Sequence, residues 1–129
     1  MHAIRLAGPW EVVRGDAPPR KVRMPAAWEA VFSTPGTAVF RRRFNRPTNL
    51  GDGTRLWLSV PEYAGAIAVR LSGEPLGTAT GEPFRAEVTG LAGSPTLEIE
   101  VTAGEGPPPT GLYGPVLLEI EEPSDADAS

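Results

Sequence analysis

Apolar and polar residues alternate in Arg55-Leu56-Trp57-Leu58-Ser59-Val60 and again in Ala66-Ile67-Ala68-Val69-Arg70-Leu71. Successive side chains of a β-strand point to opposite faces of its sheet, so each run offers one face to a core and one to water. An amphipathic helix would instead place its apolar residues three and four positions apart. Each run therefore predicts a half-buried β-strand.

The same alternation recurs along the chain, and it predicts about eight strands. The other six lie around residues 10–13, 21–24, 39–44, 84–88, 97–102 and 116–121. Turn sequences such as Gly51-Asp52-Gly53 separate them, and the chain holds 15 Gly and 15 Pro. Short strands at this spacing predict an all-β sandwich or barrel. The expected core comprises Leu56, Leu58, Ile67, Val69, Leu71, Phe84, Leu97, Ile99 and Leu118.

Three stretches depart from this pattern. Residues 29–32 could form one helical turn after Trp28, and residues 103–115, with three consecutive prolines, predict a long loop. Residues 123–129 are acidic and small, which is typical of a flexible tail. We expect one β-sandwich domain over residues 1–122 and a tail over 123–129.

Composition narrows the classes of function. The 129 residues include no Cys, which excludes disulfides and thiolate metal sites, and the sequence points to no cofactor. No apolar run is long enough for a signal peptide or a membrane span, so we expect a cytoplasmic protein without membrane contact. A net charge of −4 and a pI near 5.0 argue against nucleic-acid binding.

The charges are unevenly distributed along the chain. Residues 1–50 hold nine Lys and Arg against three acidic residues, whereas residues 51–129 hold three Arg against thirteen acidic residues. Strands from the two halves interleave in a sandwich, so we expect complementary charges on neighbouring strands.

Several short motifs occur in an order that resembles the N-terminal sugar-binding-like domain of glycoside hydrolase family two, the β-galactosidase and β-glucuronidase group. They are Leu6-x-Gly8-x-Trp10, Pro25-x-x-Trp28, Phe40-Arg41-Arg42-x-Phe44-x-x-Pro47, Val69 to Gly77, Thr96 to Val101 and Gly111 to Val116. The resemblance covers residues 6–121 and implies a galactose-binding-domain-like jelly roll. One departure is Ser72-Gly73 where that domain's hairpin usually has Asn-Gly.

The resemblance implies a fold without an active site, because the catalytic carboxylates of those enzymes lie in a downstream barrel. The sequence points to no catalytic set of its own: His2 is the only histidine, and Glu98 and Glu100 alternate on an outward face. We expect a stand-alone, non-catalytic module that binds a carbohydrate. The alternative is a protein–protein assembly module without sugar binding. No metal site is expected, although loop carbonyls could hold a structural calcium without leaving a sequence signal.

Two sets of residues are candidates for contacts. Trp28, Tyr63 and Tyr113 fall in or beside loops and could stack on a sugar, or could instead anchor those loops. Trp57 points outward, and Ala66, Ala68 and Arg70 point outward on the next strand. These residues predict an apolar patch for a homodimer or a protein partner, with Trp57 and Arg70 as contacts. The alternative is that the loop over residues 103–115 covers Trp57.

Arg42 is the unusual charge of the sequence. It shares the inward phase of Phe40 and Phe44, whereas Arg41 and Arg43 fall on the surface phase. A bulge that turns Arg42 outward, or burial beside a carboxylate, would explain it.

Overall fold

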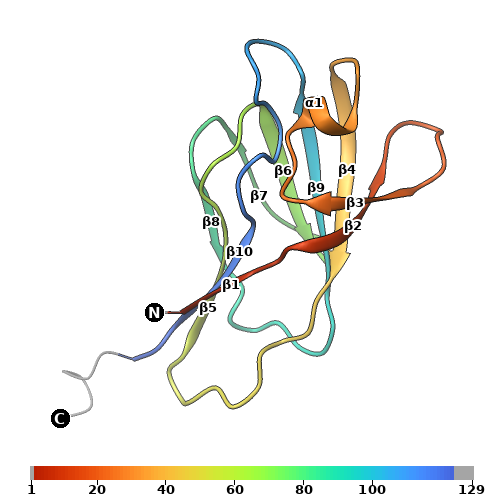
Figure 1. Ribbon diagram of the computed structural model, residues 1–129. Coiled ribbons are helices and arrows are strands. Elements are labelled where there is room, and N and C mark those ends of the chain that lie inside the picture. Colours follow the sequence, from red (N-terminus) through yellow and green to blue (C-terminus); the bar gives the residue numbers. More distant parts are fainter. Residues whose placement is uncertain (1, 124–129) are drawn as a thin grey trace.

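The computed structural model describes residues 2–123, which form two antiparallel sheets packed face to face (Figure 1). The four-stranded sheet has the order β1 (His2–Arg5), β10 (Leu117–Glu121), β5 (Arg55–Val60), β8 (Phe84–Glu87). The six-stranded sheet has the order β3 (Arg20–Met24), β2 (Gly8–Val13), β4 (Gly36–Arg43), β9 (Thr96–Ala103), β6 (Ala66–Leu71), β7 (Glu74–Thr80). One short helix, α1 (Trp28–Val31), lies where the sequence predicts a helical turn. The predicted all-β sandwich is confirmed.

The sandwich has ten strands instead of the predicted eight or so. The additional strands are β1, all of whose residues are exposed, and β7, which contains Pro75 and Gly77. Neither has the burial pattern of a core strand, so alternation could not reveal them. Both lie at sheet edges, where a proline costs no hydrogen bond inside the sheet.

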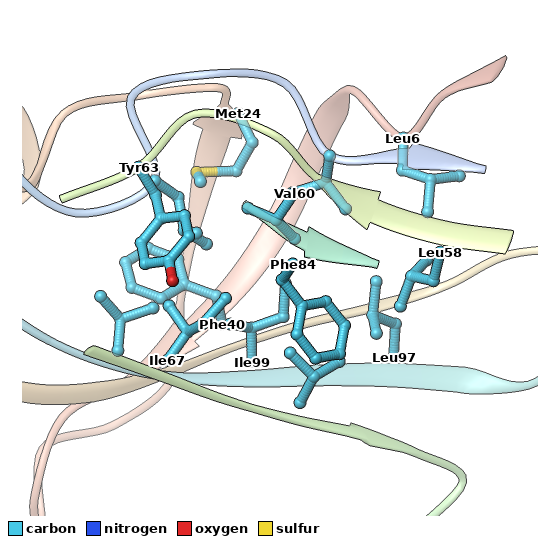
Figure 2. Packing of buried hydrophobic residues seen from close by; sticks show 14 of the residues in the cluster. Leu6, Met24, Phe40, Leu58, Val60, Tyr63, Ile67, Phe84, Leu97 and Ile99 are labelled. Carbon is cyan, nitrogen blue, oxygen red and sulfur yellow. The ribbon is translucent and has the colours of Figure 1, made fainter. Parts of the chain in front are cut away.

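The core lies between the sheets and contains the residues that the alternation selects (Figure 2). Leu56, Leu58, Leu97 and Ile99 have no exposed surface at all. Leu71 is the exception among the predicted core residues: it ends β6 at the hairpin to β7 and is only half-buried. Burial of the others follows from the period of two, because β5, β6 and β9 each turn the same face inward along their length.

Complementary charges lie on neighbouring strands, as expected from the charge distribution. Arg41 on β4 pairs with Glu11 on neighbouring β2, whereas Arg85 on β8 pairs with Glu119 on β10 at 2.8 Å across the intervening β5. Arg55 and Glu87 form a longer pair at 3.8 Å. These partly exposed pairs each stabilise the fold only slightly.

The first two strands cross from one sheet to the other. β1 belongs to the four-stranded sheet and β2 to the six-stranded sheet, with only Leu6 and Ala7 between them (Figure 1). Leu6 marks the crossing, since its carbonyl accepts a hydrogen bond from Trp10 Nε1 at 2.7 Å. As a result β2 pairs with β4 only through residues 11–13, and residues 8–10 of β2 diverge from the end of β4. We call the opening between diverging β2 and the end of β4 the fork.

The predicted tail lies outside the described residues except for Pro123. Across residues 2–123, no helix is long and apolar enough to span a membrane.

Candidate functional site

Trp28 opens α1 and is 1% exposed. Its indole N–H donates to the Thr34 carbonyl at 2.9 Å, and its ring packs on Phe32 with centroids 4.6 Å apart. The guanidinium of Arg14 covers the ring at 5.3 Å from the centroid. With its ring enclosed by these neighbours, Trp28 anchors the loops, which is the alternative that the sequence leaves open.

The loop before β10 is tied to α1 by several hydrogen bonds. The Trp28 backbone N–H donates to the Thr110 carbonyl at 2.8 Å, and Thr110 donates from its own N–H and hydroxyl to the Glu29 carboxylate. The hydroxyl bond and then the backbone bond from Thr110 lower the pKa of Glu29. Gly111 follows at φ +74°, and an added Cβ there would lie 3.0 Å from the Trp28 Cβ and 3.2 Å from its backbone nitrogen. We call α1 and residues 104–116 the closed end.

Tyr63 lies in the core cluster, 5% exposed, with its ring among the packed side chains (Figure 2). Its hydroxyl forms no hydrogen bond with any residue of 2–123. Burial raises the pKa of Tyr63, and the Glu82 carboxylate raises it further, although the nearby backbone N–H groups of Gly81 and Glu82 act to lower it. Tyr63 therefore also acts as a core residue instead of a rim residue.

Tyr113 is the one member of the aromatic set that keeps partial exposure. The fold brings the segments of all three aromatics to the closed end, since Ala64 bridges Gly111 and the Trp28 backbone bonds Thr110. Tyr113 itself stands between the buried Leu112 and Gly114. A ligand contact by Tyr113 stays a prediction.

The predicted patch around Trp57 is wrong in its composition. β5 lies between β10 and β8, so Trp57 stands opposite Glu119 and Glu87. The expected neighbours on β6, including Ala66, belong to the other sheet. The error arises because β5 and β6, consecutive in the chain, cross between sheets instead of forming a hairpin.

Trp57 is half-buried beneath other residues of its own sheet. The guanidinium of Arg85 lies 4.0 Å from the ring centroid, and the indole N–H points to Glu121 Oε1 at 3.4 Å. The loop over residues 103–115 packs on α1, so it is Arg85 that covers Trp57. Arg70 lies on the six-stranded sheet, 3.8 Å from Glu98.

Arg42 fits neither of the two explanations offered by the sequence. It pairs in register with Leu97 and β4 continues unbroken to Arg43, so no bulge turns Arg42 outward. It is half-buried, and no carboxylate among residues 2–123 forms an ion pair with it. The side chain is accommodated because the fork opens beside it.

Two cavities adjoin at the fork and share Arg42 and Arg43. One, of about 630 Å³, has Pro9 and Trp10 on its β2 side and Lys21 beside them. The other, of about 320 Å³, extends toward Arg5 and Asn45. Volumes of roughly 300–1,000 Å³ are typical of small-molecule sites.

The charge of the fork is strongly positive. Its walls hold five cations, namely Arg5, Lys21, Arg41, Arg42 and Arg43, and one carboxylate, Glu11. Glu11 is already paired with Arg41. The inward phase of Arg42 was the only signal of this site in the sequence, because the divergence of β2 from β4 has no local signature.

Carboxylates elsewhere do not assemble into a site. Glu98, one of the alternating pair on β9, stands opposite Arg41 and Arg70 and pairs with Arg70. Within residues 2–123, no group of three His, Cys, Asp or Glu side chains could hold a metal ion.

Comparison with solved structures places this fold among glycosidases. It matches an FMN-binding β-glucuronidase from Faecalibacterium prausnitzii over 92% of this chain with TM-score 0.72 and 26% identity. A β-glucuronidase from Bifidobacterium dentium matches over 93% with TM-score 0.77 and 21% identity, and a rhamnosidase from Novosphingobium over 94% with TM-score 0.71 and 25% identity. The fold resemblance to family two glycosidases is thereby confirmed, and one further match is a β-galacturonidase of that family.

This chain spans only 22%, 30% and 15% of those three structures, respectively. No family model matches the sequence, and no curated protein matches it.

Proposed function

We propose that this sandwich is a non-catalytic accessory module that binds carbohydrate. The observation that carries the proposal is the match to glycosidases over more than nine-tenths of this chain but less than a third of theirs. A module of that extent corresponds to one accessory domain of a larger glycosidase. The chemistry of the described residues agrees, since paired surface carboxylates such as Glu98 are engaged with arginines.

A binding experiment tests the proposal directly. Isothermal titration calorimetry of the purified chain against neutral and acidic mono- and oligosaccharides should detect binding of at least one. A saccharide at about 100 times its dissociation constant should also stabilise the fold by roughly 2.7 kcal/mol in a thermal-shift assay. Absence of binding across the panel, or hydrolysis of a glycoside by the isolated chain, would overturn the proposal.

The alternative is a protein–protein assembly module, and the outward position of Trp57 favours it. Arg85 and Glu121 cover part of the ring, so a partner would have to replace or extend these contacts. Light scattering on wild type and Trp57→Ser decides it. A wild-type homodimer that the substitution dissociates supports assembly, whereas two monomeric proteins without a partner exclude Trp57 as a contact.

A further inference from the structure

We infer that the fork is a binding site for an acidic saccharide, whose carboxylate Arg42 and Arg43 would hold. The inference rests on the proposed carbohydrate-binding function and assigns it a place and a ligand class. Four observations carry it: the concentration of charge, the half-buried position of Arg42, the character of the walls and the available space.

The concentration of charge opposes that of the whole chain. Five of the 12 Lys and Arg residues line the fork, while the chain carries a net charge of −4. Arg5, Lys21, Arg42 and Arg43 form no ion pair with any carboxylate of residues 2–123. A recess walled by charges of one sign raises the local concentration of oppositely charged ligands.

Arg42 is placed where a charge needs a partner. It occupies the core phase of β4 and is half-buried, and withdrawing an unpaired charge from water is costly. Neighbouring Arg41 forms an ion pair with Glu11, whereas Arg42 lines the two cavities of the fork. A planar guanidinium donates two parallel hydrogen bonds to a carboxylate, so a carboxylate ligand would supply the partner that Arg42 lacks.

The walls favour a saccharide over a bare inorganic anion. Exposed Pro9 supplies apolar surface beside the cations, with buried Trp10 behind it, and Thr96 and Asn45 supply neutral polar groups. A sugar acid presents an apolar ring face, hydroxyls and a carboxylate to these three kinds of group. Phosphate or sulfate alone would leave the apolar surface and much of the 630 Å³ unused.

The decisive experiment compares matched ligands on matched variants. Glucuronate and galacturonate oligosaccharides are titrated against their neutral glucose and galactose counterparts, with inorganic phosphate as a third arm. The variants are Arg42→Gln and Arg43→Gln, and the control is Arg55→Gln, which removes the same charge from an exposed site on the four-stranded sheet. Two-dimensional NMR of the arginine Nε–H groups provides a second readout.

We expect the acidic saccharide to bind wild type and Arg55→Gln alike, and each fork variant to weaken binding by about 10- to 100-fold. The Nε–H signals of Arg42 and Arg43 should shift and that of Arg55 should not. Equal binding of neutral saccharides would overturn the fork inference and leave the proposed function standing. Phosphate binding as strong as that of the saccharide, or unchanged affinity in the fork variants, would overturn the inference too. No saccharide binding at all would overturn both.

Discussion

The two ends of the sandwich use their residues in opposite ways. At the closed end, Trp28 is 1% exposed. Its indole N–H donates to the Thr34 carbonyl, and the Arg14 guanidinium lies over its ring. At the fork, Arg42 and Arg43 line open space and form no ion pair with any carboxylate among the described residues. The end that contains the residue types most typical of sugar recognition is thus filled, while the open end is lined with cations.

This difference shows that residue type alone does not locate a site. An aromatic side chain beside a loop gains more from burial in the core than from exposure to water, so it packs wherever the loop can fold over it. A guanidinium loses solvation on burial, so it stays at an opening. Four variants test the contrast, from the largest expected effect to the smallest.

Trp28→Ala should cause the largest loss of stability. The substitution empties the space between α1 and the loop before β10 and should lower the free energy of unfolding by about 3–5 kcal/mol. Urea unfolding followed by circular dichroism measures it. A loss below about 1 kcal/mol would mean that the closed end is loosely packed and that Trp28 is available to a ligand.

Gly104→Ala should have the next largest effect. Gly104 has φ +98°, and an added Cβ would lie 2.6 Å from the Pro35 Cα and 2.7 Å from Trp28 Nε1. Backbone strain and the contact together should cost about 1–3 kcal/mol. The matched control is Gly90→Ala in the loop near the fork, where a Cβ meets nothing within 4 Å and the change should stay within about 0.5 kcal/mol. Equal effects at both glycines would erase the contrast between the ends.

Glu29→Gln should reveal a pH-dependent contribution at the closed end. The hydrogen bonds from Thr110 hold the folded-state pKa of Glu29 below its ordinary value of 4.5, so its carboxylate stabilises the fold above that pH. That stability is lost as the pH falls from 4.5 through the lowered folded pKa. The difference in unfolding free energy between wild type and Glu29→Gln should therefore be largest near pH 7 and shrink below pH 4.5. A constant difference across this range would show that Thr110 does not favour the charged form.

Arg42→Met should have the smallest effect on stability. Methionine keeps the apolar stem of the side chain and removes a half-buried charge that has no partner among residues 2–123. We expect the free energy of unfolding to stay unchanged or to rise by up to about 1 kcal/mol. If urea unfolding shows that the free energy of unfolding falls by more than about 1 kcal/mol, Arg42 has a structural role and the fork is not a binding site.

Sequence reasoning succeeded where the determining interactions are local. The burial of Leu58 and Ile99 follows from alternation within one strand, and the helical turn begins at Trp28, next to the residues where the sequence predicts it. It failed where two distant strands decide the outcome. Trp57 received the wrong neighbours because sheet membership of β5 and β6 is a property of the whole topology. The phase of Arg42 was visible in the sequence, but the opening beside it depends on where β2 diverges from β4.

The position of β10 affects how the protein is made in the cell. β10 lies between β1 and β5, so β1, the first of these ten strands to be synthesised, can pair only after β10, the last of them. Until residue 121 emerges, the edge of β5 that pairs with β10 has no partner strand, and Leu58 lacks the packing that β10 provides. The nascent chain is therefore prone to aggregation while this edge is exposed. Folding of the four-stranded sheet completes in one late step, when β10 inserts. A slower ribosome would lengthen that exposure, and a chaperone that holds β5 during it would raise the yield of folded protein.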